Sequence, residues 1–150
     1  MSRFLIIGYG NRLRGDDGAG YRAAELLRDR LAGGRDIEVL AVHQLTPELM
    51  EPVSRAQHVI FIDAAAAGGR VGEIRRQELT ATGGPAIFTH QATPRDLLAT
   101  AAELFGSCAS GALYTIAGER FEFGDTLTAS VELAMAELVK TIEDAVVRTD

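Results

Sequence analysis

The feature that most constrains the fold is a repeated alternation between short apolar runs and longer amphipathic stretches. Apolar runs of strand length occupy residues 4–8, 37–42, 58–63 and 112–117, and helical spacing of apolar residues marks about 17–31, 93–105 and 128–147. This alternation is typical of βα units, in which helices cover both faces of a largely parallel sheet. We therefore expect an α/β fold with three layers, α/β/α, around a mostly parallel twisted sheet of about five strands.

One expected strand differs from the others. Residues 71–79 alternate apolar and polar side chains, which indicates an antiparallel or edge strand rather than a buried central one. Thr46-Pro47 and Thr93-Pro94 each place a hydroxyl cap before a proline and so predict helix starts, and Gly106 predicts a helix end. At 150 residues, nearly half of them apolar, the chain is expected to form a single domain over 1–150.

Charge and cysteine content exclude several classes of partner. The net charge of -6, with 15 basic and 21 acidic residues, disfavours nucleic acid and anionic membranes, because either would repel the protein. A single cysteine cannot form a disulfide framework or a thiolate zinc cluster within one chain.

The apolar stretch near Met1 is too short for a signal peptide or a membrane span, so we expect a cytoplasmic protein. No segment typical of self-pairing is evident, and we expect a monomer.

Candidate ligand side chains lie at three places, two of them after apolar strands and one in the loop before a helix. Asp16 and Asp17 end the loop after the first strand, Asp63 closes the third strand, and His90 precedes a helix. Ligands of open α/β sheets bind beyond the carboxyl ends of the strands, so these groups are expected at one edge. Two carboxylates and an imidazole would suit a divalent transition metal such as nickel or zinc.

Each of these residues also has a structural interpretation. Asp16 or Asp17 could cap the following helix, Asp63 could end its strand through a local turn hydrogen bond, and His90 could be an ordinary loop histidine. His43 follows the second strand and is equally consistent with a turn, a substrate contact or metal binding. His58 begins a strand, at the wrong end of the sheet for a ligand, and is expected to be structural.

Other site types fit the sequence poorly. Gly8 and Gly10 after a strand suggest dinucleotide binding, but Leu13 replaces the third glycine and two adjacent aspartates would repel phosphates. The chain contains neither a Gly-x-Ser-x-Gly elbow nor a His-Glu-x-x-His zinc helix. An aspartic protease mechanism would need a second matching aspartate loop, which the sequence lacks.

Residues 8–20 form a longer and more specific motif, Gly-Tyr-Gly-Asn-Arg-Leu-Arg-Gly-Asp-Asp-Gly-Ala-Gly. This run resembles the signature of the hydrogenase maturation protease family, Gly-x-Gly-Asn-x-Leu-x-x-Asp-(Glu or Asp)-Gly-x-Gly. The likeness continues through residues 61–64, Phe-Ile-Asp-Ala, and through His-Gln at 90–91, and it extends over essentially the whole chain.

The resemblance implies a function and a set of site residues. In that family three residues coordinate nickel, and their counterparts by motif are Asp17, Asp63 and His90, with Asp17 and Asp63 also the expected catalytic carboxylates. Many relatives have glutamate at the position of Asp17, so the ligand here is one methylene shorter. The implied activity is an endopeptidase that removes the carboxyl-terminal extension of a nickel-iron hydrogenase large-subunit precursor. Nickel would come with that substrate and would not be held stably by the enzyme.

Other residues of the motif are expected to shape the loop. Gly8 and Gly10 would allow its tight course, Asn11 would organise it through hydrogen bonds to the backbone, and Asp16 would support a ligand. His43 lies in a loop that resembles the version found in some subgroups of the family. Two alternatives stay open: a metal-dependent amidohydrolase or phosphohydrolase on the same scaffold, and a nonenzymatic nickel-binding module.

Overall fold

The computed structural model describes residues 2–66, 69–80, 92–107 and 109–148 of the chain. Its strands form one sheet in the order β2-β1-β3-β5-β4. The strands are β1 (Ser2–Tyr9), β2 (Ile37–Val42), β3 (Ala56–Ala65), β4 (Ile74–Leu79) and β5 (Ser110–Ala117). All neighbours are parallel except β4, which runs antiparallel to β5 at one edge. The predicted mostly parallel sheet with one antiparallel strand is confirmed.

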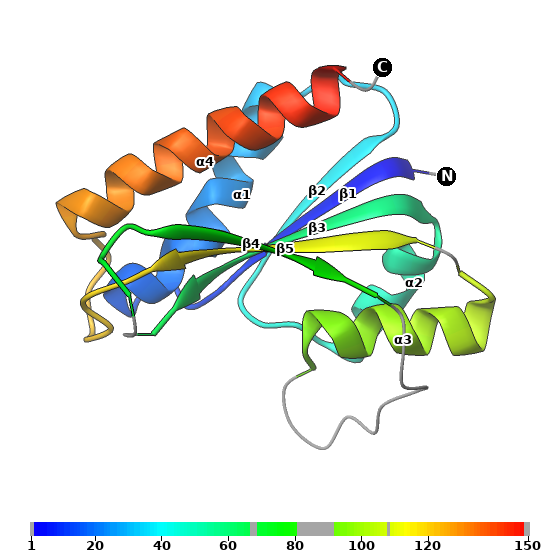
Figure 1. Cartoon of the computed structure of the whole chain (residues 1–150), viewed down its shortest axis with the longest axis horizontal. Helices are drawn as coiled ribbons and strands as arrows, with labels where there is room; N and C mark the ends of the chain where they lie inside the picture. The colour runs from blue at the N-terminus through cyan, green and yellow to red at the C-terminus, as the bar shows by residue number, and fades with distance from the viewer. Residues whose placement is uncertain (1, 67–68, 81–91, 108, 149–150) are drawn as a thin grey trace.

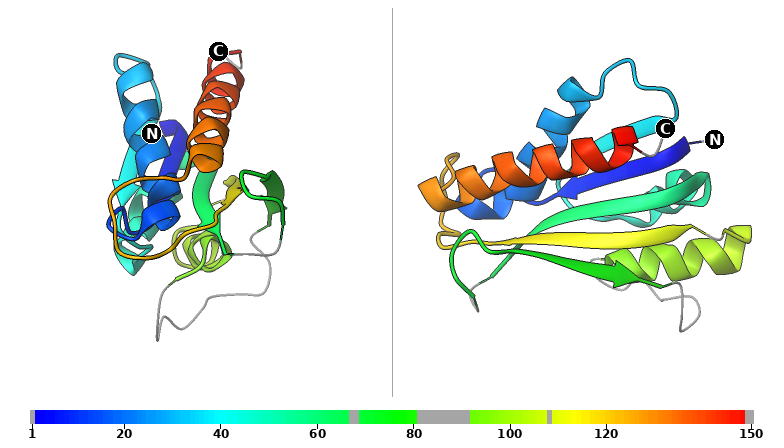
Figure 2. Two further views of the ribbon diagram at one scale, coloured as in Figure 1. Left: turned by 90° about the vertical axis from the view of Figure 1, so that its left-hand side faces the viewer. Right: turned by 45° about the horizontal axis from the view of Figure 1, so that its top comes forward.

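Helices cover both faces of this sheet. The helices are α1 (Ala19–Arg30), α2 (Met50–Ser54), α3 (Pro94–Phe105) and α4 (Ala129–Arg148), and two short 3₁₀ turns, η1 (Gly15–Gly18) and η2 (Pro47–Leu49), precede α1 and α2. Figure 1 shows α1 and α4 on one face and α2 and α3 on the other, and the views in Figure 2 agree. The predicted three-layer arrangement is thus confirmed.

The core consists of two apolar clusters, one on each face of the sheet. Successive side chains of a strand point to opposite faces, and β1 supplies both clusters in this way. Phe4 and Ile6 pack with α1 and α4, whereas Leu5 and Ile7 pack with α2 and α3. Because both faces of β1 are buried, its sequence is a continuous apolar run rather than an alternating one.

The start and the end of α3 follow the signals in the sequence. Thr93 and Asp96 form a capping box, in which each side chain accepts a backbone hydrogen bond of 3.1 Å from the other residue. Pro94 is the first helical residue. Gly106 has a φ of 69°, the left-handed conformation that ends many helices and favours glycine.

Some element boundaries differ from the prediction. The helix expected from Asp17 begins only at Ala19, because Gly15–Gly18 form a 3₁₀ turn. The third strand does not end at Asp63 but continues to Ala65, paired with β5. The antiparallel strand is shorter than predicted and begins at Ile74. These shifts follow from pairing with other elements, which local sequence patterns do not contain.

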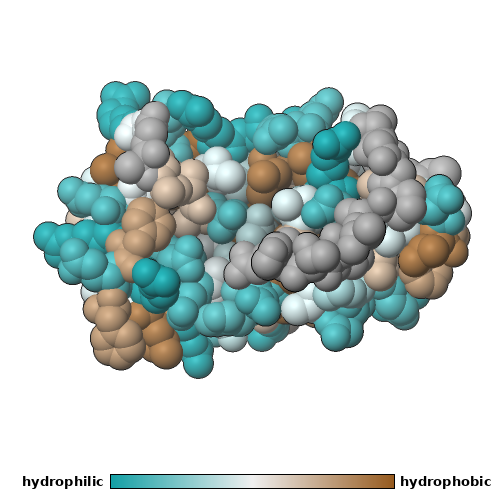
Figure 3. Space-filling model, turned by 90° about the horizontal axis from the view of Figure 1, so that it is seen from below, coloured by the Kyte–Doolittle hydropathy of each residue, from teal (hydrophilic) through white to brown (hydrophobic). Residues whose placement is uncertain are grey.

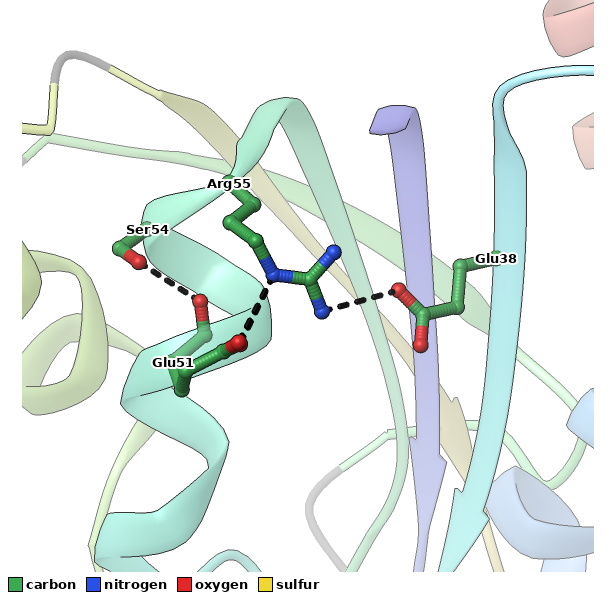
Figure 4. A network of polar contacts seen from close by, with 4 residues as sticks. All are labelled: Glu38, Glu51, Ser54 and Arg55. Carbon is green, nitrogen blue, oxygen red and sulfur yellow. Dashed lines mark hydrogen bonds and ion pairs between the residues drawn. The ribbon is translucent and has the colours of Figure 1, made fainter. Parts of the chain in front are cut away.

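A polar network links the edge strand β2 to the residues around α2 (Figure 4). The Arg55 guanidinium donates to both carboxylate oxygens of Glu51, at 2.9 and 2.8 Å, and lies 3.9 Å from a carboxylate oxygen of Glu38. The Ser54 hydroxyl donates to the Glu51 carbonyl at 2.6 Å. Because these ion pairs are exposed to water, they contribute little to the stability of the fold.

The surface is mostly hydrophilic on the face that Figure 3 shows, with hydrophobic side chains in separate groups. Leu104 and Phe105 are exposed at the end of α3, and Phe123 is 89% exposed in the segment after β5. None of the described helices is long and apolar enough to cross a membrane.

Candidate functional site

The strand order places a crevice between the ends of β1 and β3. The chain leaves β1, passes along α1 on one face and returns as β2; it then passes along α2 on the other face and returns as β3. The strands on either side of β1 are therefore reached through opposite faces of the sheet. In open α/β sheets, ligands bind at such a switch point, outside the carboxyl ends of the strands.

A pocket of about 350 Å³ lies at this point. Its wall comes from the end of β1 and the loop that follows it, from the loop after β2, from the end of β3, and from Ala92 before α3. The lining residues are Tyr9, Gly10, Asn11, Arg14, Asp17, His43, Gln44, Leu45, Asp63, Ala64 and Ala92. The structure thus brings Asp17 and Asp63 together at one edge of the sheet, as expected, and it also places His43, Gly10 and Asn11 on the wall of this pocket.

The loop after β1 is held in a tight course by backbone contacts. Gly10 has a φ of 145°, and a Cβ atom there would lie 2.0 Å from the carbonyl oxygen of Asp17. The backbone amide of Asn11 donates to Asp17 Oδ2 at 2.9 Å, and the side-chain oxygen of Asn11 accepts from the backbone amide of Leu13 at 2.9 Å. This loop therefore needs glycine at position 10 and holds the Asp17 carboxylate in place.

Glycines also let α1 approach the sheet closely. A Cβ on Gly20 would lie 2.3 Å from the Ile62 carbonyl oxygen in β3 and 2.6 Å from the Tyr9 carbonyl oxygen at the end of β1. A Cβ on Gly8 would lie 2.1 Å from the Gly20 carbonyl oxygen. The start of α1 thus rests directly on β1 and β3, which brings Asp17 near Asp63.

Asp63 lies partly buried in an environment that disfavours its charge. Burial raises the pKa of Asp63 to about 6; hydrogen bonds from the Tyr9 hydroxyl and the Ala64 amide oppose this shift, and the charge of Asp17 adds to it. The Ala64 amide donates to Asp63 Oδ1 at 2.8 Å. Two carboxylates close enough to repel each other would gain from a cation between them.

Tyr9 is the residue of this site that sequence reasoning missed. Burial, and then the charge of Asp63 and the hydrogen bond to it, raise the pKa of Tyr9 far above its usual range. Its phenol therefore remains protonated at neutral pH and donates to Asp63. The sequence signal for Tyr9 is its position at the carboxyl end of an apolar strand, between Gly8 and Gly10.

Asp16 points away from this pocket although it precedes Asp17 directly. Its buried carboxylate accepts hydrogen bonds from the amides of Glu119, Arg120 and Thr128, at 2.8, 3.0 and 2.8 Å, and from the Thr128 hydroxyl. Burial alone would raise the pKa of Asp16, but these hydrogen bonds outweigh it and lower that pKa. Asp16 thus ties the first loop to the segment before α4. The N-cap of α1 is Gly18, and neither aspartate caps the helix.

The remaining histidines lie in different regions. His58 lies near the amino end of β3, where its Nδ1 forms a hydrogen bond of 2.6 Å with the Ser110 hydroxyl. His90 lies outside the described residues. Within the described part of the chain, no three His, Cys, Asp or Glu side chains form a metal-binding group. The observed part of the site is therefore a pair of carboxylates, with His43 on the same wall.

A pair of partly buried carboxylates is suited to a hard or borderline divalent cation. Aspartate oxygens bind such cations, and an added imidazole would favour nickel or zinc over calcium or magnesium. The donor set of Asp17 and Asp63 therefore fits part of a site for such a cation. A larger groove of about 760 Å³ lies near His58, and among the described residues that line it Glu78 alone is acidic.

Part of the chain is similar in sequence to a curated protein. No family model matches the chain. It is 30% identical over 99 residues to the hydrogenase 2 maturation protease of Escherichia coli, an alignment that covers 63% of this chain. The matched part spans 57% of that curated relative.

Solved structures of such proteins have a similar fold. HycI, a nickel-iron hydrogenase maturation protease from Thermococcus kodakarensis, aligns with a TM-score of 0.78 and 24% identity over 95% of this chain and 91% of that one. The hydrogenase maturating endopeptidase HybD from Escherichia coli aligns with a TM-score of 0.74 and 23% identity, over 98% and 93% of the two chains. The chain thus has the fold of these nickel-iron hydrogenase maturation proteases, and over 99 residues its sequence is similar to that of one such protease.

Proposed function

We propose that this chain is a cytoplasmic endopeptidase that removes the carboxyl-terminal extension of a nickel-iron hydrogenase large-subunit precursor. The observation that carries the proposal is the convergence of Asp17 and Asp63 on one pocket. Both belong to the stretches that resemble the maturation protease family. The relatives in sequence and in fold are named as hydrogenase maturation proteases or endopeptidases, which supports the same class of reaction.

The proposed role of the site is to recognise nickel that the precursor already carries. Asp17 supplies carboxylate oxygens from the η1 turn and Asp63 from β3, and His90 is the expected third ligand. Bound nickel would polarise the scissile carbonyl or activate a water molecule. The two aspartates would orient the precursor, so that the peptide bond to be cut lies beside the pocket.

The charge of the pocket supports selection for a precursor that contains nickel. Burial, and to a smaller extent the charge of Asp17, raises the pKa of Asp63, so two ionised carboxylates there carry an energetic penalty. A divalent cation on the substrate would remove this penalty. A precursor without nickel would leave the repulsion in place and would bind more weakly.

The test is cleavage of a purified large-subunit precursor in nickel-containing and nickel-free forms, followed by intact mass. We expect the wild-type protein to release the carboxyl-terminal extension only from the nickel-containing form. Asp17→Ala, Asp63→Ala and His90→Ala should each reduce the rate by at least about 100-fold, because each would remove a group that positions the reacting bond. Asp29→Ala is the control, since Asp29 is an exposed aspartate of α1 outside this pocket.

Two results would overturn the proposal. One is an intact precursor after incubation with folded wild-type protein, and the other is equal cleavage without nickel and without the three side chains. Stable metal in the purified protein, with hydrolysis of small amides or phosphate esters, would favour a metal-dependent amidohydrolase or phosphohydrolase. Nickel binding without any hydrolysis would favour a nickel-binding module.

A further inference from the structure

Tyr9 and Asp63 lie side by side because of the register between their strands. Gly8 of β1 pairs with Ile62 of β3, so Tyr9 and Asp63 occupy the next position on two neighbouring parallel strands. Side chains at matching positions of such strands project to the same face of the sheet. Both residues also line the pocket. Their proximity is thus set by the central strand pairing of the fold, not by a loose loop.

The Asp63 carboxylate is held by two donors. The Ala64 amide donates to Oδ1 at 2.8 Å, and the Tyr9 hydroxyl donates a further hydrogen bond to the carboxylate. A carboxylate has about four lone-pair directions, so two donors fix its orientation and leave acceptor positions for a ligand. The Tyr9 contact is the side-chain contact of the pair, and it can be removed without altering the backbone.

We propose that Tyr9 is a positioning residue, whose hydroxyl holds the Asp63 carboxylate in the orientation that faces the nickel-bearing part of the substrate. This inference rests on the proposed function. Groups that hydrogen-bond to a ligating carboxylate fix its geometry, and their loss typically lowers metal affinity or activity by about 10- to 100-fold. A purely structural role is the competing explanation, because a partly buried tyrosine hydroxyl usually finds some partner.

The experiment compares wild type, Tyr9→Phe, Asp63→Asn and Tyr114→Phe. Tyr9→Phe removes one hydroxyl and retains the ring that packs beside the core. Tyr114→Phe removes a hydroxyl from β5, outside the pocket, and is the matched control. Calorimetric titration of each protein with Ni²⁺ alone measures affinity, and cleavage of the nickel-containing precursor measures kcat and KM separately.

We expect Tyr9→Phe to weaken Ni²⁺ binding by about 10- to 100-fold, with Tyr114→Phe unchanged. The loss of cleavage should appear mainly as a higher KM, because the contact with nickel is present in the bound precursor and in the transition state alike. A structural role alone would lower the melting temperature of Tyr9→Phe but leave the Ni²⁺ affinity and the KM of the folded protein unchanged.

The outcomes separate this inference from the proposed function. If wild type does not cleave precursors but Tyr9→Phe still binds Ni²⁺ more weakly than wild type, the proposed reaction is wrong and the role of Tyr9 stands. If wild type cleaves and Tyr9→Phe has the same Ni²⁺ affinity and KM, the role of Tyr9 is wrong and the reaction stands. If wild type binds no free Ni²⁺ but cleaves, an unchanged KM in Tyr9→Phe overturns the role of Tyr9; a wild-type protein that neither binds Ni²⁺ nor cleaves overturns both proposals.

Discussion

Asp16 and Asp17 are adjacent and belong to the same sequence motif, but they have different roles in the structure. The η1 turn sends the Asp16 side chain into the protein, toward the segment before α4, and leaves Asp17 on the pocket wall. Asp16 accepts several hydrogen bonds and has a lowered pKa, whereas Asp17 adds to the raised pKa of Asp63. One carboxylate stabilises the fold, and the other contributes to the charge of the site.

Replacement of Asp16 by asparagine should destabilise the protein. Asparagine offers one carbonyl oxygen where the carboxylate offers two, and its amide group would face backbone donors. We expect the free energy of unfolding at pH 7 to fall by about 2–3 kcal/mol, a typical effect for buried donors left unpaired. Urea unfolding of Asp16→Asn and of the exposed control Asp29→Asn measures this difference.

The pH dependence of Asp16→Asn follows from the direction of the pKa shift. Because the folded state lowers the pKa of Asp16, its stabilising effect is complete above the unfolded pKa of about 4 and is lost as the pH falls through the lower folded value. The difference in unfolding free energy between wild type and Asp16→Asn should therefore shrink at pH 3. A difference that stays constant from pH 7 to pH 3 would contradict this role.

The sequence indicates some of these residues better than others. Asp17 and Asp63 could be placed at one edge because each follows an apolar strand, and the carboxyl ends of parallel strands meet at one edge. The partners of Asp16 are 103 to 112 residues away, and no local pattern reveals them. The contact of Tyr9 with Asp63 requires the strand order, in which β1 and β3 are neighbours. The prediction for His90 stays a prediction.

At the scale of elements, most helices and strands could be predicted because their periodicity and end signals agree. β2 and α3 have the predicted bounds, and the capping signals of α3 are all used. The start of α1 differs, since the 3₁₀ turn before it depends on contacts with the segment after β5. The Asp16 amide, for example, donates to the Arg120 carbonyl at 2.7 Å.

The close approach of α1 to the sheet can be tested with Gly20→Ala. A methyl group at this position would lie 2.3 Å from a backbone oxygen of β3, so the start of the helix must move outward. We expect a loss of about 1–3 kcal/mol in unfolding free energy, as for other overpacked sites. Precursor cleavage by the remaining folded protein should fall by about 10- to 100-fold, because Asp17 moves with the helix start.

Gly124→Ala is the matched control for this substitution, because a Cβ at Gly124 would meet no atom within 4 Å. It should retain the stability and cleavage rate of wild type. If Gly20→Ala is destabilised but its folded fraction cleaves at the wild-type rate, the spacing between α1 and the sheet does not set the position of Asp17.

At the scale of the whole molecule, the fold partly buries the carboxyl group of Asp63, and this burial lowers the stability of the folded protein when the carboxyl group is charged. The switch point beside the central strand gives a ligand access to the sheet, but it also removes Asp63 from water. Burial and the nearby Asp17 together outweigh the two hydrogen bonds that Asp63 accepts. Functional sites commonly reduce the stability of the proteins that carry them.

Asp63→Asn should therefore stabilise the free protein and inactivate it. The folded state raises the pKa of Asp63 to about 6, above its unfolded value of 3.8, so the folded state binds more protons between these values and loses stability as the pH rises through them. Asparagine is neutral at every pH; its carbonyl oxygen can accept from the Ala64 amide, and the Tyr9 hydroxyl can donate to that oxygen or accept from the side-chain amide. Urea unfolding at pH 8 should show a gain of up to about 3 kcal/mol over wild type, and the gain should vanish below the unfolded pKa of about 4. A variant that is less stable than wild type at pH 8 would mean that the hydrogen bonds to the charged carboxylate outweigh its burial. The repulsion between the two aspartates would then be too small to make the pocket select a precursor that carries nickel.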